Sequence, residues 1–254
     1  MNKKLFLLPF ALLGLVACEP KEPEVELKSY EGATISTIAQ VAAGADGDVF
    51  SIAGTVVAKY AASDYAGIYV ANGAEGMQLY GYENVDVEVG DFVVATGARS
   101  FYKNGRAAEM VKKFNNAEVE GAGIVKYDLT EYDVASFGVT VADPVAYTFD
   151  GAAWETLTSS EDASTYAAVT GRKITVTGTV TGTVPTDTAN NMTLNIMVGE
   201  TQVAVYVHKS NDAAATREAV AALVAGDSVT VSGLVGSYKG STQIVCIQSL
   251  VKNA

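Results

Sequence analysis

The sequence has few of the residues from which metal centres and nucleophilic sites are built. Its 254 residues include two cysteines and one histidine, His208. No Cys or His pair has metal-site spacing, and neither a glycine-rich phosphate loop nor a G-x-S-x-G motif occurs. His208 has no acidic or nucleophilic partner in its run, so we expect a surface histidine and not a catalytic base. These absences favour a protein without catalytic residues, bound metal or cofactor.

One short stretch has part of the sequence pattern of a calcium-binding loop. Asp46-Gly47-Asp48 places two carboxylates around a glycine, but the rest of the D-x-D-x-D-G-x5-E spacing is missing. Asp and Gly are also the residues that turns favour. We therefore expect a turn here, ahead of the first strand.

The first residues have the pattern of an export signal. Lys3 and Lys4 precede an apolar run, residues 5–16, which is too short to span a bilayer. The run ends in Leu-Val-Ala-Cys, which resembles the lipobox of bacterial lipoproteins. This resemblance implies cleavage of residues 1–17, a lipid on Cys18, and an anchor in the bacterial envelope, in an outer membrane on its periplasmic or exposed face.

Basic residues are also scarce. Removal of residues 1–17 leaves 15 Lys and Arg against 29 Asp and Glu, a net charge of −14. This balance excludes a protein whose whole surface attracts nucleic acid. Residues 18–30 are acidic and interrupted by proline, and we expect them to form a tether. Only Cys246 then remains as a thiol, and its apolar surroundings predict a buried structural cysteine.

Most of the remaining chain predicts strands, and the pattern occurs twice. Residues 49–58, VFSIAGTVVA, match residues 172–181, RKITVTGTVT, with a glycine inside each strand. Each is followed by a hairpin, in residues 66–82 and 192–209, and then by a Gly-Asp strand that ends in a turn with an aromatic residue, Lys and Gly. A fifth strand closes each copy. The fold class is therefore all-β, with two five-stranded barrels in tandem and short helices.

The two copies differ in length between their third and fourth strands. The second copy has NDAAATREAVAALVAG there, residues 211–226, which predicts a helix capped by Asn211 or Asp212. A five-stranded barrel with an optional helix at this place is the plan of the OB-fold.

Three stretches of the first copy, VFSIAGTVVA, GIYVANGAEGMQLYGY and VGDFVVATGARSFYKNG, together resemble the OB-fold domains found in tandem in lipoproteins of gut-type Gram-negative bacteria. The resemblance covers about 75 residues in each half, and the second copy lacks a clear G-I-Y-V hairpin. It implies a Greek-key OB-fold in residues 31–122 and a second in residues 123–254. We expect residues 34–44 to form a lead-in helix capped by Thr34, and residues 123–170 to pack on the second barrel.

OB-folds bind ligands across strands two and three, between the loops that join strands one to two and four to five. In the first copy these loops are residues 59–65 and 99–106, and residues 99–113 carry a local charge of +4. Aromatic rings there are expected to stack on bases or sugars, and cations to meet phosphate or carboxylate groups. The predicted ligand site is Lys59, Tyr60, Tyr65, Tyr69, Arg99, Phe101, Tyr102, Lys103 and Arg106. The second copy offers only Tyr238 and Lys239 in its loops.

An alternative assignment gives these side chains structural work, as anchors that pack on the barrel and cations that balance nearby acids. Two functions therefore stay open. One is a non-catalytic lipoprotein that captures an extended polymer, an oligosaccharide or single-stranded nucleic acid, or binds a protein partner. The other is a structural or assembly component of the envelope without a small ligand.

Overall fold

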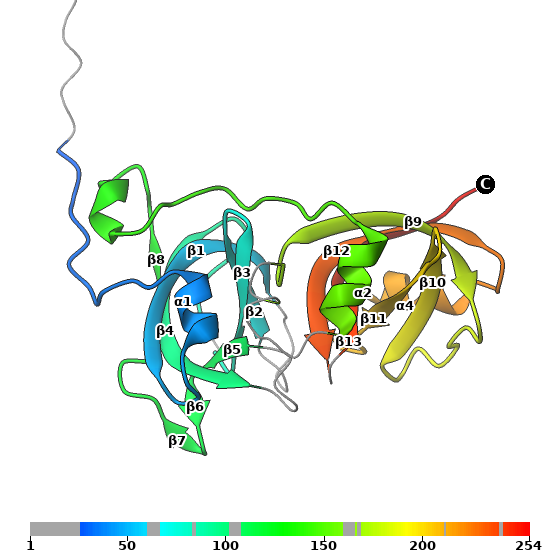
Figure 1. Ribbon diagram of the computed structural model, residues 1–254, viewed down its shortest axis with the longest axis horizontal. Coiled ribbons are helices and arrows are strands. Elements are labelled where there is room, and N and C mark those ends of the chain that lie inside the picture. The colour runs from blue at the N-terminus through cyan, green and yellow to red at the C-terminus, as the bar shows by residue number, and fades with distance from the viewer. Residues whose placement is uncertain are drawn as a thin grey trace, which may run out of the picture.

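The computed structural model describes residues 26–59, 67–82, 85–101, 108–159, 166, 169–210, 212–238 and 241–254. The expected signal peptide, residues 1–17, and the expected lipid site, Cys18, lie outside these ranges. The described chain forms two closed five-stranded barrels placed side by side (Figure 1). The predicted all-β tandem OB-fold is therefore confirmed.

The first barrel has the strand order of an OB-fold. Its sheet runs β1-β2-β3-β5-β4 and closes through pairing of β1 with β4, while β3 and β5 are parallel. An apolar interior forms because alternate side chains of each strand point inward. The strands are β1 (Val49–Lys59), β2 (Gly67–Asn72), β3 (Glu75–Tyr80), β4 (Phe92–Phe101) and β5 (Ala108–Val111).

The second barrel repeats this order and adds the predicted helix. Its strands close as β10-β11-β13-β12-β9, again with one parallel pair, β11 with β13. Helix α4 (Ala214–Ala221) lies between the third and fourth strands. The strands are β9 (Lys173–Thr181), β10 (Met192–Val198), β11 (Thr201–Val207), β12 (Ser228–Tyr238) and β13 (Ser241–Lys252).

The glycine inside each first strand occupies the same place in both barrels. A Cβ at Gly54 would lie 2.6 Å from the backbone oxygen of Ala71, and one at Gly178 would lie 2.6 Å from that of Met197. Each glycine thus lets the first strand approach the second closely enough to serve both sides of its barrel.

The repeated Gly-Asp pair is a turn that holds three strands together. Gly90 and Gly226 adopt positive φ of 102° and 95°, which glycine tolerates best. Asp91 accepts a hydrogen bond from Glu88 N and forms an ion pair with Lys126, while Asp227 accepts from Val224 N and forms an ion pair with Lys252. The turn, its hydrogen bond and its ion pair are therefore all present in both barrels.

A short helix precedes each barrel. Helix α1 (Ile38–Ala43) is capped by Thr37 in a capping box with Gln40, so the predicted cap at Thr34 is wrong by one turn. Helix α2 (Gly151–Ser159) starts after Asp150, whose side chain accepts from Ala153 N, and it buries Trp154 in the core of the second barrel. Both helices cover one side of their barrel (Figure 1).

Two expectations around α4 are wrong. The cap is Ala213, without a side-chain bond, because the Asp212 carboxylate instead accepts from His208 N at 2.6 Å and Ile247 N at 2.9 Å. His208 is 7% exposed and is not a surface histidine. Asp212 thus ties the start of the helix to β13, and its burial raises the pKa of its carboxyl.

The segment expected to pack on the second barrel is divided between the two barrels: residues 123–141 pack on the first, whereas the later part, with Phe149 and Trp154, packs on the second as predicted. Strand β8 (Gly123–Tyr127) pairs with β4 as a sixth strand, and the 3-10 helix η1 (Val134–Phe137) buries Phe137 against Phe92 and Tyr127. The first unit therefore extends beyond the boundary expected at residue 122, because aromatic residues after β8 cover an apolar outer face of β4. The small hairpin of β6 (Lys113–Phe114) and β7 (Ala117–Glu118) precedes β8.

The two barrels contact each other through apolar outer positions. One cluster joins Val57, Ala58, Tyr69 and Ala71 of the first barrel with Leu234, Val245 and Cys246 of the second. Next to it, a Cβ at Gly76 would overlap the backbone oxygen of Thr170. The close approach of these two backbones depends on a glycine at residue 76.

Candidate binding surfaces

The structure describes four of the nine residues of the predicted ligand site. Lys59, Tyr69, Arg99 and Phe101 are described, while Tyr60, Tyr65, Tyr102, Lys103 and Arg106 lie outside the described residues. Lys59 ends β1, Tyr69 is on β2, and Arg99 and Phe101 are at the end of β4.

Arg99 is held inside the end of the first barrel. Its side chain donates to Asp46 Oδ1 at 2.9 Å and to the backbone oxygen of Ala42 at 3.0 Å. Its guanidinium lies 3.3 Å from the centroid of the Phe101 ring. The residue is 3% exposed, and this burial lowers the pKa of the guanidinium. Arg99 and Phe101 therefore have the structural role that the sequence analysis gave as the alternative to ligand binding. Asp46, which holds Arg99, could not be identified as its partner from the sequence.

Lys59, the last residue of β1, is bound at the opposite end of the first barrel. Its Nζ donates to the backbone oxygens of Val85 at 3.1 Å and Val87 at 2.9 Å. Because β1 and β4 are antiparallel, with Val49 opposite Ala98, Lys59 and Arg99 are separated by most of the length of β1. The structure therefore does not bring these two cations together.

Tyr69 lies in the contact between the barrels. Its side chain is part of the cluster with Leu234, Val245 and Cys246, and the residue is 4% exposed. The hydroxyl donates to Gln78 Oε1 at 3.2 Å. This ring is covered by the second barrel and does not offer a stacking face to a ligand.

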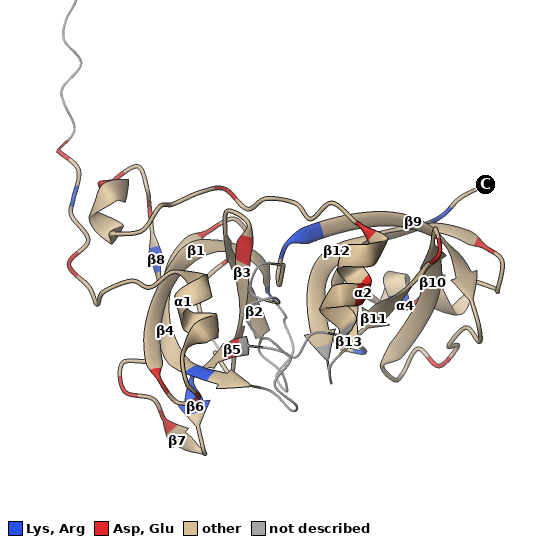
Figure 2. Ribbon diagram, in the orientation of Figure 1, with Lys and Arg blue, Asp and Glu red and all other residues tan. Residues whose placement is uncertain are grey.

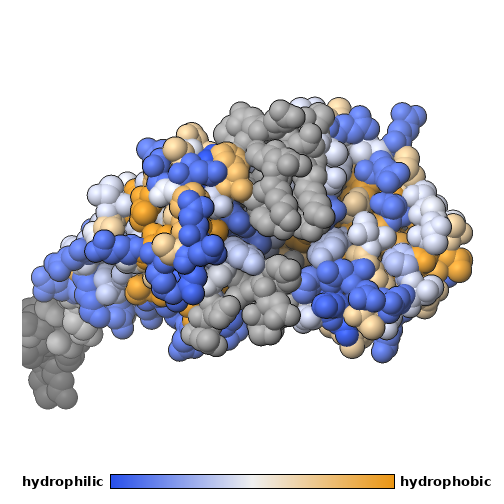
Figure 3. Space-filling model, turned by 90° about the horizontal axis from the view of Figure 1, so that it is seen from below, coloured by the Kyte–Doolittle hydropathy of each residue, from blue (hydrophilic) through white to orange (hydrophobic). Residues whose placement is uncertain are grey.

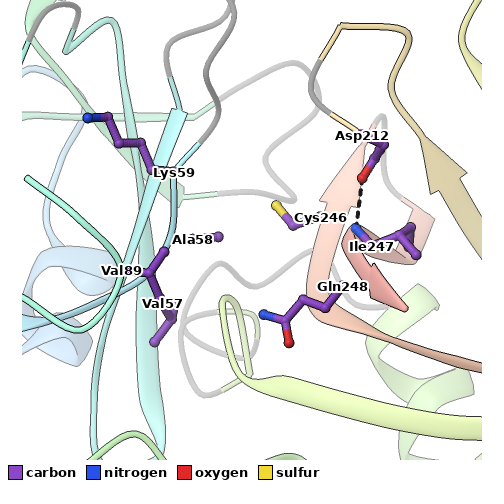
Figure 4. A pocket seen from close by; sticks show the side chains of 8 residues that line it. All are labelled: Val57, Ala58, Lys59, Val89, Asp212, Cys246, Ile247 and Gln248. Atoms are coloured by element: carbon purple, nitrogen blue, oxygen red, sulfur yellow. Dashed lines mark hydrogen bonds between the residues drawn. The ribbon is translucent and has the colours of Figure 1, made fainter. Parts of the chain in front are cut away.

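A small cleft of about 200 Å³ opens beside this contact (Figure 4). Val57 and Val89 line one wall, and Cys246 and Gln248 line the other. The Lys59 amine points away from the second wall, toward its own barrel (Figure 4). The predicted burial of Cys246 is confirmed.

Glu109 is a buried acid on the outer side of β5. It is 7% exposed, and desolvation raises the pKa of its carboxyl to about 7. The neighbouring strands place Ser100 and Gln78 beside it. In the described part of the chain no basic group forms an ion pair with Glu109.

Basic side chains in the described ranges are mostly engaged within the protein. Ion pairs with carboxylates are formed by Lys28, Lys113, Lys126 and Lys252. Arg172 donates to backbone oxygens, as Lys59 and Arg99 do. Figure 2 shows basic and acidic residues dispersed over both barrels without a continuous basic stripe on the described chain. On the side seen in Figure 3, hydrophobic residues are interspersed with hydrophilic ones.

The outer face of β9, β12 and the end of β13 is uncharged and lined by hydroxyl groups. Strand pairing places three rows there, each with one residue of β9, one of β12 and one from the end of β13 or, for Asn253, directly after it. We call this face the hydroxyl grid, and its rows are Thr175–Ser232–Ser249, Thr177–Thr230–Val251 and Thr179–Ser228–Asn253. Figure 2 shows β9 tan along its length, with a basic residue only at its start.

Among the described residues, no group of three His, Cys, Asp or Glu side chains is arranged to hold a metal ion. None of the helices in this part of the chain combines the length and the apolar character that crossing a membrane requires.

Comparison with known proteins finds no matching family model and no similar curated protein. Solved structures to which the chain is similar include the single-stranded DNA binding protein from Thermus aquaticus, at 13% identity and a TM-score of 0.26, covering 83% of this chain and 95% of that one. Fission yeast Pot1 with ssDNA is 9% identical, with a TM-score of 0.36 and coverage of 89% and 90%. A replication protein A heterotrimer bound to ssDNA is 12% identical, with a TM-score of 0.30 and coverage of 82% and 49%. These values carry no argument about function, and the assignment of two OB-folds in tandem rests on the strand order of this chain's own barrels.

Proposed function

We propose that the protein is a non-catalytic lipoprotein of the bacterial cell envelope that uses its tandem OB-folds to bind an extended, uncharged polymer. The export signal and the lipobox-like ending before Cys18 support the envelope location. An oligosaccharide fits this proposal better than single-stranded nucleic acid does. The fold by itself does not decide between them, because OB-folds bind both.

The observation that carries the proposal is the distribution of charge. Nucleic-acid binding draws most of its affinity from basic side chains that neutralise phosphates. Here most of the described basic side chains already bind a carboxylate or a backbone oxygen, and the hydroxyl grid is free of charge. An uncharged polymer does not need the cations that this protein uses internally.

The test is a combined glycan and oligonucleotide array, probed with the chain that lacks residues 1–18, at low and high salt. We expect binding to uncharged glycans that persists as salt is raised. Binding to oligonucleotides that falls steeply with salt would replace the proposed ligand with nucleic acid. Binding to neither set would favour an assembly component of the envelope, which cross-linking in intact cells would detect as a fixed protein neighbour.

The proposed anchor has a separate test. Cys18→Ser in the full chain should abolish incorporation of labelled palmitate and move the protein from the membrane fraction to the soluble fraction. Cys246→Ser is the matched control, because its thiol is buried in the folded protein. Labelling of the Cys18→Ser chain at the level of the unaltered chain would refute the lipid anchor.

A further inference from the structure

The first barrel has a face at the same position as the hydroxyl grid, and other segments of the chain cover that face. Alignment of Gly54 with Gly178 makes Ser51, Ala53 and Thr55 the equivalents of Thr175, Thr177 and Thr179. The Ser51–Thr96 hydroxyl pair at 2.7 Å corresponds to the Thr175–Ser232 pair at 2.7 Å. Even the third strand is matched, because β8 pairs with β4 as the end of β13 pairs with β12.

The two faces differ in what lies on them. On the first barrel, Ala53, Phe92 and Val94 are buried under a cluster that includes Ile35 and Phe137. On the second barrel, the middle positions are Thr177, Thr230 and Val251, and no described segment covers them. Val251 is 55% exposed. The same architectural face is thus closed and apolar in one copy and open and hydroxylated in the other.

The hydroxyl groups of the grid are held by one another. Thr177 and Thr230 share a hydrogen bond of 2.9 Å, in addition to the Thr175–Ser232 pair. Asn253 joins two residues of the grid, because its Nδ2 donates to Ser228 Oγ at 2.9 Å and its Oδ1 accepts from Thr230 Oγ1 at 3.3 Å. Strand geometry spaces neighbouring rows by roughly 7 Å and neighbouring strands by about 4.8 Å. Groups that are already oriented lose little conformational entropy when a ligand binds.

The grid is uncharged in a chain of strongly negative charge. Its nine positions carry seven hydroxyls, one amide and one valine, while acidic residues outnumber basic ones by 29 to 17 over the whole sequence. The nearest ion pair, Lys252–Asp227, lies at its border. None of the nine positions is a cation for a phosphate or carboxylate group, and the exposed Lys173 lies at the border beside Thr175. Hydroxyl and amide groups, in contrast, donate to and accept from sugar hydroxyls. Threonine methyls and Val251 add apolar contact for the C–H face of a sugar ring.

From these observations we infer that the hydroxyl grid is a binding face for a neutral polysaccharide, with successive sugar units lying across β9, β12 and β13. This inference rests on the proposed function and gives it a site. The site differs from the predicted one, because it lies on the second barrel and on the outer face of its first, fourth and fifth strands.

The test uses affinity electrophoresis of the chain without residues 1–18 in gels that contain dextran, laminarin, xyloglucan or glucomannan. We expect retardation by at least one of these polysaccharides, unchanged between about 50 mM and about 200 mM salt. The double substitution Thr177→Val with Thr230→Val keeps side-chain shape and strand propensity and should weaken binding about tenfold. Thr193→Val with Ser241→Ala removes two exposed hydroxyls of the same barrel outside the grid and should leave binding unchanged.

The outcomes separate this inference from the proposed function. Retardation that is equal for the unaltered chain and the Thr177–Thr230 double variant would overturn the grid as the site while the protein remained a glycan binder. Absence of retardation in all four gels would overturn the grid's proposed ligand. Binding to other uncharged glycans on the array would then still support the proposed function. Absence of binding on the array as well would refute both the grid site and the proposed function.

Discussion

At the scale of single residues, the buried charges of the first barrel serve its structure. Arg99 and Asp46 join the end of β4 to the turn before β1, and Asp46 Oδ1 also accepts from Phe101 N at 3.0 Å. A guanidinium that is desolvated, hydrogen-bonded and stacked on a ring is positioned by several contacts at once. Its hydrogen-bonding groups face protein and not a ligand.

Arg99→Ala should therefore destabilise the protein. We expect a loss of about 2 kcal/mol in the free energy of unfolding, because packing on Phe101 and the bonds to Asp46 and Ala42 disappear together. Urea denaturation measures it. Lys113→Ala is the control, since its ion pair with Glu118 is exposed and should contribute less than about 0.5 kcal/mol. Equal effects of both substitutions would contradict the structural role of Arg99.

Glu109 predicts a specific dependence of stability on pH. Its pKa is about 7 in the folded protein, against 4.5 for the ordinary group, so the folded state holds a proton that the unfolded state releases between these values. Stability contributed by this group is thus present below pH 4.5 and is lost as pH rises toward 7, by up to about 3 kcal/mol.

Glu109→Gln should remove this loss. We expect the variant to be more stable than the unaltered chain at pH 8 and to differ little from it at pH 4, as measured by urea denaturation at both values. Glu118→Gln, at an exposed position, controls for the general effect of removing a carboxylate. Parallel pH profiles for the unaltered chain and Glu109→Gln would show that the carboxyl is not desolvated.

At the scale of elements, strand β8 and helix η1 act as one cover on the first barrel. Phe137 contacts Phe92, Tyr127 and Tyr30, and Tyr30 N donates to Ser136 Oγ at 2.7 Å. Residues that precede the barrel and residues that follow it are thereby joined over β4.

Phe137→Ala should release this cover. A buried phenylalanine that becomes alanine costs about 3 to 5 kcal/mol where the surroundings cannot collapse, and the loss should fall on β8 and η1 first. Hydrogen exchange followed by mass spectrometry should show faster exchange in residues 123–141 with little change in β9–β13. Uniform acceleration across both barrels would instead indicate one cooperative unit.

The repeated pattern predicted the two barrels because it is local. Alternating side chains, the glycine within each first strand and the Gly-Asp turn each act over a few residues, and together they identify the five strands of each copy. Thr34 and Thr37 show the limit of such reasoning, because both precede the helix and only Thr37 has Gln40 in reach for a capping box. Asp212 shows a second limit of local reasoning, because its carboxylate binds Ile247 N, which is distant in sequence and could not be foreseen from the residues around it.

The candidate site was less predictable than the fold. Outer positions such as Val57 and Tyr69 have the residue types of a ligand face, and they are also suited to packing on another barrel. A signal was present in Val56, Val57 and Ala58, three consecutive apolar residues at the end of a strand, which indicate burial on both faces. The hydroxyl grid was overlooked because threonine is common in strands, and only register shows its hydroxyls to be paired.

At the scale of the whole molecule, the barrels form a joined pair and not two independent modules. The contact covers Tyr69 with Leu234 and Val245, and a Cβ at the junction residue Gly171, which has φ 73°, would lie 3.5 Å from the Tyr69 ring. Each barrel nevertheless has a separate apolar core. Separation of the barrels should therefore leave both folded while exposing the surfaces between them.

Gly76→Val tests this arrangement. A side chain at residue 76 would overlap the Thr170 backbone, so the barrels must move apart, and Cys246, which is buried in their contact, should become exposed. In the chain without residues 1–18 this is the single thiol, and we expect its reaction with a thiol reagent to accelerate at least about tenfold, while circular dichroism stays that of two folded barrels. Gly123→Val is the control, because a Cβ there meets no atom within 4 Å. Unchanged thiol reactivity in a folded Gly76→Val chain would mean that the contact between the barrels does not protect Cys246.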